Sequence, residues 1–137
     1  MSYVGAGALQ TAVFQTLLAD TDLGAIVGSD IYDVLPSGTL PSIYVTIGDE
    51  EVKDASYSTG SAARVSLLVS VVSDTGGYAN AKAAATAISN ALVGVSLTLT
   101  EGYLVGLWFQ KSSARRTDDP DVRRLDLTFD ALVQETV

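Results

Sequence analysis

The spacing of apolar residues changes near residue 43, and this change limits the folds that the chain can adopt. Between residues 7 and 20 apolar side chains recur every four positions, as in an amphipathic helix. From residue 43 they alternate with other residues, as in a strand with one buried face. The residues that define the two patterns are Leu9, Val13 and Leu17, and then Ile43, Val45 and Ile47. The chain therefore combines helices with a β-sheet.

Further segments repeat these two patterns. A short helical turn is expected at residues 23–27, and a full helix at residues 78–92, whose buried stripe is mostly alanine and should lie flat against a sheet. Further strands are expected at residues 31–34, 65–72, 96–100, 103–109 and 124–133. In residues 103–109 strict alternation places Tyr103, Val105, Leu107 and Phe109 on one face and Leu104, Gly106 and Trp108 on the other.

The order of these elements predicts an α+β domain that spans residues 1–137. A chain of 137 residues is the length of one domain with one core. We expect a mostly antiparallel sheet with two helices packed on one face. Residues 48–63 are too long for an ordinary connection and are expected to form a long hairpin arm that a partner orders. A charged turn is expected at residues 110–123.

Composition excludes several classes of function. The chain has neither Cys nor His, which removes disulfides, thiolate nucleophiles, histidine bases and the commonest metal ligands. Its net charge of -8 disfavours nucleic-acid readers and proteins that bind anionic membranes. The first basic residue is Lys53, and no stretch of about 18 residues is wholly apolar, so we expect a cytosolic chain without a signal peptide or a membrane span.

Apolar residues on the second face of the sheet predict a subunit interface. Two helices cover one face only, yet Leu68, Val72, Leu104 and Trp108 are expected to point away from them. A soluble monomer rarely leaves such a patch bare. The alternative is that the arm or the last strand folds back over these residues.

Acidic residues gather in the expected arm. They lie in a polar segment without the order of a calcium loop, so paired-carboxylate chemistry and a metal site are weakly supported, and a partner-facing or solvated arm is favoured. The candidate interaction residues of the arm are Asp49, Glu50, Glu51, Lys53, Asp54 and Tyr57.

Basic residues are concentrated near the other end of the chain. Residues 1–110 hold three basic and ten acidic residues, whereas residues 111–137 hold five and six. This asymmetry allows a head-to-tail contact between copies that closes a ring. The equal alternative is a hairpin tip whose charges pair within the chain. The candidate residues are Arg115, Arg116, Asp118, Asp119, Arg123 and Arg124, beside Lys111 and Asp121.

No motif in the chain predicts catalysis or a cofactor. Neither a phosphate-binding lysine loop nor a nucleophile elbow is present, and Gly5-Ala6-Gly7 follows no strand. We therefore expect a non-enzymatic protein without cofactor or metal. A metabolite-binding regulatory module and a hydrolase built on the arm carboxylates are weaker alternatives.

Taken together, the patterns resemble the tail terminator proteins of long-tailed phages and phage-derived gene transfer agents, also called tail-completion or head–tail joining proteins. The resemblance spans nearly the whole chain. Its segments are the helix from Ala8 to Asp20, Leu23, Ile26 to Gly28, Ile31 to Asp33, Leu40-Pro41, Tyr44 to Gly48, the strand from Val65 through Gly77 into the helix Tyr78–Leu92, and the turn Asp119–Arg124 before Leu125–Phe129.

The resemblance implies a structural virion protein at the head–tail junction, assembled in the host cytoplasm. Such a subunit forms a homohexameric ring on the major tail tube protein, ends tube growth and meets the head-completion or neck protein. DNA passes through the channel without specific binding, and no membrane is involved. The arm would reach the tube, the lumen or a neighbour. A neck stopper or another tail subunit is the nearest alternative.

Overall fold

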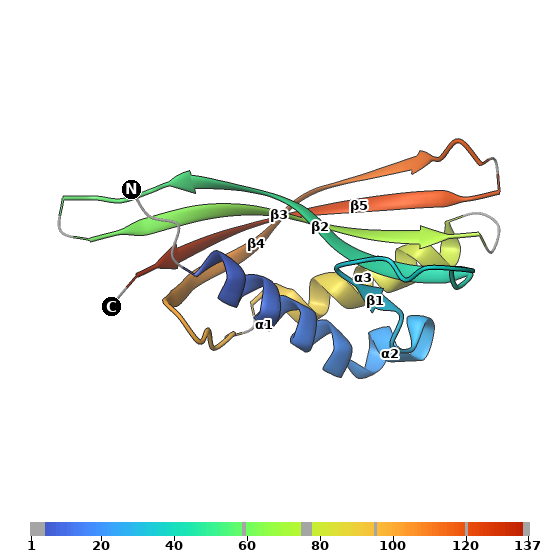
Figure 1. Ribbon diagram of the computed structural model, residues 1–137, viewed down its shortest axis with the longest axis horizontal. Coiled ribbons are helices and arrows are strands. Elements are labelled where there is room, and N and C mark those ends of the chain that lie inside the picture. The colour runs from blue at the N-terminus through green and yellow to red at the C-terminus, as the bar shows by residue number, and fades with distance from the viewer. Residues whose placement is uncertain (1–4, 59, 75–77, 95, 120, 136–137) are drawn as a thin grey trace.

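A computed structural model describes residues 5–58, 60–74, 78–94, 96–119 and 121–135 (Figure 1). Gly77, one of the residues in the family pattern, lies outside these ranges. The elements are α1 (Ala6–Ala19), α2 (Thr21–Val27), β1 (Ile31–Tyr32), β2 (Ile43–Asp54), β3 (Ala62–Ser73), α3 (Ala79–Leu92), β4 (Tyr103–Arg116) and β5 (Arg123–Gln134).

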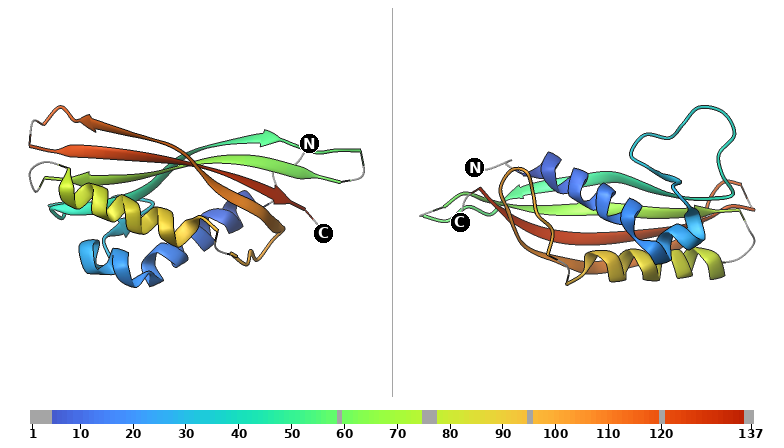
Figure 2. Two further views of the ribbon diagram at one scale, coloured as in Figure 1. Left: turned by 180° about the vertical axis from the view of Figure 1, so that it is seen from behind. Right: turned by 90° about the horizontal axis from the view of Figure 1, so that it is seen from below.

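The strands form one sheet in the order β1-β2-β3-β5-β4. Among the described strands, three pairings are antiparallel, and only the two-residue strand β1 runs parallel to its neighbour β2. The expected α+β class with a mostly antiparallel sheet is confirmed. The described helices all lie on one side of the sheet (Figures 1 and 2).

The number of helices differs from the expected two. Residues 21–27 form a seven-residue helix rather than a single turn, because the Asp20 side chain accepts a hydrogen bond from the Leu23 backbone N–H at 2.9 Å and caps the first turn. Gly28, with φ +61°, ends this helix. The helix buries Leu23 and Val27 and so adds to the core.

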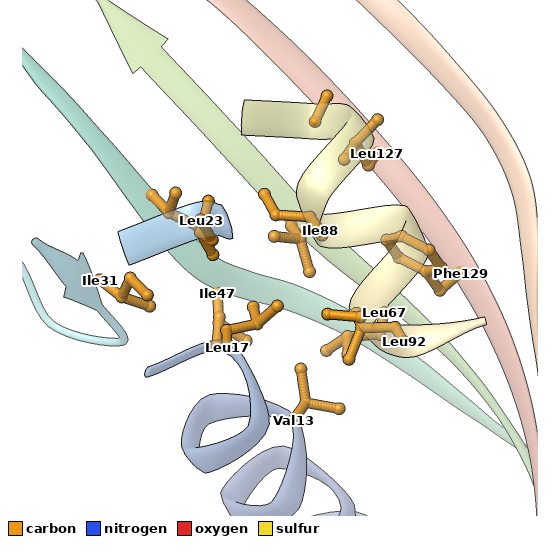
Figure 3. Packing of buried hydrophobic residues seen from close by; sticks show 14 of the residues in the cluster. Val13, Leu17, Leu23, Ile31, Ile47, Leu67, Ile88, Leu92, Leu127 and Phe129 are labelled. Atoms are coloured by element: carbon orange, nitrogen blue, oxygen red, sulfur yellow. The ribbon is translucent and has the colours of Figure 1, made fainter. Parts of the chain in front are cut away.

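The core lies between the helices and the sheet (Figure 3). Helix α1 supplies Leu9, Val13 and Leu17, as its four-residue spacing predicts. Helix α3 buries five alanines beside Ile88 and Leu92, which allows its backbone to lie close to β3 and β5. Phe129 of β5 is fully buried beneath this helix.

The prediction of a strand at residues 96–100 is wrong. This segment has no strand pairing, although Leu97 and Leu99 pack partly buried against the core. The alternation therefore reflects an irregular connection with one buried side, a pattern that periodicity alone does not distinguish from a strand.

Two β-bulges in β4 overturn its expected alternation. The register with β5 shifts between Leu104 and Gly106 and again between Phe109 and Lys111. Each extra residue reverses the side on which the following side chains lie. Leu104 consequently packs against the core on the helix side, as Leu107 does, and not on the opposite face as expected.

Both charged segments belong to long hairpins, as expected for the arm, whereas the charged turn is shorter than the expected residues 110–123. Most of residues 48–63 continues β2 and β3 in antiparallel register, so the arm is a regular extension of the sheet. Likewise, Lys111–Arg116 belongs to β4, and the turn between β4 and β5 covers residues 117–122 only. The two hairpins extend beyond the helices at opposite ends of the sheet (Figure 2).

Candidate functional site

The helix-free face of the sheet carries side chains of mixed character. Trp108 lies on this face and is 46% exposed. Its ring covers Gly106, where a Cβ atom would overlap the indole. Val72 is buried, and Leu40, Pro41 and Val122 line one small cavity with it. The loop before β2 and the turn before β5 therefore lie beside this end of the face.

Strand β4 also carries four exposed apolar side chains, those of Tyr103, Val105, Trp108 and Phe109, each 44–52% exposed. Tyr103 and Trp108 lie on the helix-free face, whereas Phe109 lies on the helix side. A shallow groove of about 420 Å³ runs between the end of α3 and β4, lined by Val93, Leu97 and Leu104 among others. Because monomers seldom leave several such side chains in water, this strand is a candidate contact surface.

The hairpin of β2 and β3, which we call the acidic hairpin, exposes the residues predicted for the arm. Asp49, Glu50, Glu51, Lys53 and Asp54 are exposed, and Lys53 Nζ lies 3.2 Å from Glu51 Oε1. Tyr57 stands at the hairpin tip, 53% exposed, where its hydroxyl accepts a hydrogen bond from Gln134 Nε2 at 3.0 Å. In the described ranges no three acidic side chains converge as a metal site would require.

The hairpin of β4 and β5, which we call the basic hairpin, contains an internal charge cluster centred on Asp126. Arg124 Nε donates to Asp126 Oδ1 at 2.8 Å, and Arg115 Nε donates to Oδ2 at 3.3 Å. The Ser70 hydroxyl of β3 donates to Oδ1 at 2.6 Å and accepts from Arg124 Nη2 at 3.1 Å. Two of the predicted arginines thus already contact a carboxylate of their own chain.

The remaining predicted residues of this hairpin lie around its tip. The Arg123 guanidinium stacks over the Tyr78 ring at 5.8 Å. Asp119 caps the turn, with its carboxylate accepting from the Asp121 N–H at 3.0 Å, and Asp118 is exposed beside it. Arg116 is exposed and has no ion-pair partner among the residues that the structure describes.

Sequence reasoning missed Asp126, although the sequence contains a pattern that points to it. It lies two residues after Arg124 on the polar face of an alternating strand, where the two side chains share one side of the sheet. Its pairing with Arg115 depends on the β4 register, which the bulges set. Partial burial acts to raise the pKa of Asp126, but hydrogen bonds from Ser70 and Arg124, the Arg124 charge and the Arg115 hydrogen bond together hold this pKa below its ordinary value.

Replacing Asp126 by asparagine is expected to lower the free energy of unfolding by about 1 kcal/mol at pH 7. Because the folded-state pKa is depressed, the carboxylate stabilises the fold above its unfolded pKa of about 3.9, and this contribution is lost as the pH falls through the folded pKa. Urea unfolding of Asp126→Asn and wild type should therefore differ at pH 7 and converge as the pH falls below both the unfolded and the folded pKa of Asp126. Asp130→Asn, on the same strand face, is the control; an equal loss there would contradict this role for Asp126.

No described helix is both long enough and apolar enough to cross a bilayer. The described acidic side chains lie at exposed or half-buried positions, and Asp126, the one with a depressed pKa, is engaged by two arginines. The arrangement suits charge-guided contacts between proteins rather than proton transfer to a substrate.

Comparisons with known proteins agree with the fold. The family model described as "Tail completion protein gp17" matches residues 11–134. A chain in the solved structure entitled "Virion of native gene transfer agent (GTA) particle" is similar to this chain, with 52% identity and a TM-score of 0.93; the match covers 97% of this chain and 99% of that chain. No curated protein matches. The chain therefore belongs to the tail completion protein gp17 family.

Proposed function

We propose that this tail completion protein is a virion subunit that caps the tail tube as a ring, ends tube polymerisation and joins the tail to the neck of the head. The observation that carries the proposal is the nearly full-length similarity, at 52% identity, to a chain of a gene transfer agent virion. The family is structural, and the protein is not an enzyme.

The charge distribution supports assembly from identical copies. An acidic hairpin and a basic hairpin extend from opposite ends of one sheet, so one copy offers a negative and a positive surface at once (Figure 2). Contacts between unlike surfaces are heterologous, and they form a ring when the rotation between copies closes. A hexamer is the expected ring, seated on the major tail tube protein and facing the head-completion protein.

The net charge supports a passive channel. A subunit with a charge of -8 repels DNA on average, so a ring of such subunits allows DNA to pass without specific binding. The ring would lie at the head–tail junction of the virion after assembly in the host cytoplasm. Tube subunits polymerise without limit, whereas a terminator stops after one ring. This difference distinguishes the proposed terminator from a tail tube subunit.

Electron microscopy of particles from producer cells that lack this gene tests the proposal. We expect filled heads beside loose tails, or tails of uncontrolled length, and restoration by the wild-type gene on a plasmid. Tails of normal length joined to heads would contradict the proposal. Heads that lose their DNA, next to tails of normal length, would instead assign the protein as a neck stopper.

A further inference from the structure

The sheet has two edges that carry opposite charge. Within the described residues, β4 pairs with β5 along one side and has no strand on its other side. At the opposite edge, β1 covers only Val45 and Thr46 of β2, so none of the described strands lies beside the outer side of residues 48–54. Long open edges are sites at which another chain adds a strand.

The directions of these two edge strands are compatible with pairing between copies. Three successive antiparallel pairings separate β2 from β4, so the two strands run in opposite directions. If a second copy lies beside the first in the same orientation, its β2 meets β4 as an antiparallel neighbour. The sheet then continues from one copy into the next without reversal.

We propose that the outer edge of β4 in one copy binds the outer edge of β2 in the next, with Arg115 opposite Glu51 and Arg116 opposite Glu50. The inference rests on the proposed ring and names the contact that builds it. On β4 the edge carries Lys111, Arg115 and Arg116, and on β2 it carries Asp49, Glu50, Glu51 and Asp54 against the single Lys53. Complementary charge directs one edge to the other and disfavours like edges.

The side of the sheet on which each residue lies restricts the register. Arg115 shares the helix-free face with Glu51 and Lys53, as the pairings through β3 and β5 show. Arg116, like Glu50, lies on the helix side. A slip of one residue would place opposed side chains on different faces, so only registers two residues apart compete.

Charge then separates the competing registers. In the proposed register Arg115 and Arg116 face Glu51 and Glu50, Ala114 faces Val52, and Ser113 faces Lys53, so no like charges oppose. A slip of two residues in one direction places Lys111 directly opposite Lys53, and like charges directly opposed across strands are destabilising.

Arg115 is held in a conformation that leaves it able to take a second carboxylate. Its Nε donates to Asp126, while the guanidinium carries further donors on the two terminal nitrogens. The Arg115 side chain is 55% exposed. Asp126, itself fixed by Ser70 and Arg124, thus positions Arg115 at the edge before a partner arrives.

The same register brings two exposed aromatic rings toward each other. Continued along β4, it brings the tip of the next copy's acidic hairpin toward Trp108. Tyr57 at that tip bonds Gln134 on the helix-free face, the face on which Trp108 also lies. The two rings are 46–53% exposed in the single chain. Burial of both rings in one contact would remove them from water and add to the charged pairs.

The contact also displaces successive copies along the strands. Within one chain, the row across the sheet that contains Arg115 and Val72 reaches β2 at Tyr44. In the contact, Arg115 lies opposite Glu51 on β2 of the next copy, a different position along that strand. Closure of a sheet into a barrel requires such a stagger between strands. The helix-free face would line the channel and the helices would lie outside.

A disulfide experiment tests the register directly, because the chain has no cysteine of its own. Particles that carry the double variant Ser113→Cys with Lys53→Cys are oxidised and separated on a non-reducing gel. We expect a ladder of covalent oligomers that ends at the ring. Each single variant should give no ladder, because a head-to-tail contact never brings two identical positions together.

The double variant Lys111→Cys with Lys53→Cys is the matched control. Its two cysteines lie directly opposite each other only in the rejected register. In the proposed register they are diagonal neighbours, which lie too far apart for an unstrained disulfide. A ladder from this control would overturn the edge contact. So would the absence of a ladder from Ser113→Cys with Lys53→Cys in particles that join normally, although the normal joining would leave the proposed function intact.

Charge exchange gives a second test that separates assembly from folding. Arg115→Glu with Arg116→Glu should prevent tail joining, and so should Glu50→Arg with Glu51→Arg. Co-expression of the two variants should restore joined particles, because copies that alternate around a ring oppose unlike charges at every contact. Persistent failure of the mixture, with both variants folded by circular dichroism, would contradict the edge contact.

Discussion

Truncation of Phe129 to alanine is expected to lower the free energy of unfolding by about 3–5 kcal/mol. The ring is fully buried in β5, between β3 and β4 in the sheet and beneath α3. It meets Phe109 edge to face, with ring centroids 5.8 Å apart. Removing the ring takes away its burial and leaves a cavity that the surrounding strands fill only partly.

Urea unfolding followed by circular dichroism measures this loss. Phe109→Ala is the matched control, because it removes the other ring of the same pair from a position that is 44% exposed. The control should lose clearly less stability. Equal losses in the two variants would show that the aromatic pair, rather than burial at Phe129, is the source of the stabilisation.

Enlargement of Ala84 to leucine is expected to destabilise the fold by about 1–3 kcal/mol. Ala84 is fully buried in the core cluster, where the small side chains of α3 allow close approach of neighbouring elements. Leucine adds volume that the packed interface accommodates only by shifting the helix or straining a rotamer.

Ala83→Leu provides the comparison for this variant. Ala83 is the preceding residue in the same helix and is exposed, so the same substitution should change stability by no more than about 0.5 kcal/mol. Thermal unfolding of both proteins measures the difference. Equal melting temperatures would mean that α3 does not depend on small side chains for its packing.

The parts of the fold that were predictable from sequence are those where one side of an element is buried along its length. The alanine stripe of α3 and the alternation in β5 each have one wet side, so the period of the apolar residues reports the local structure. In β4 the bulges change the side that faces the core, and nothing in local composition marks Val105 as the extra residue. The position of Leu104 is therefore a property of the register.

The candidate site also has parts that the sequence predicts and parts that depend on the tertiary register. The two charged hairpins were found because charge composition is directly visible in a sequence, and the structure places them at opposite ends of the sheet. The strand at residues 111–116, expected as part of a turn, was missed because its Ser and charged residues lack a buried face that would impose alternation. The Asp126 cluster depends on three strands at once, and only the tertiary register brings Ser70 and Arg115 to it.

The two bulges of β4 also bear on the solubility of a subunit that has not yet assembled. A flat strand of fourteen residues with exposed aromatic rings is a template for fibril growth, in which identical strands stack without limit. Bulges increase the local twist and interrupt the regular spacing of edge hydrogen bonds, so an identical β4 does not match this edge along its length. The irregularity that defeats sequence prediction thus favours a dispersed pool of subunits over an amyloid.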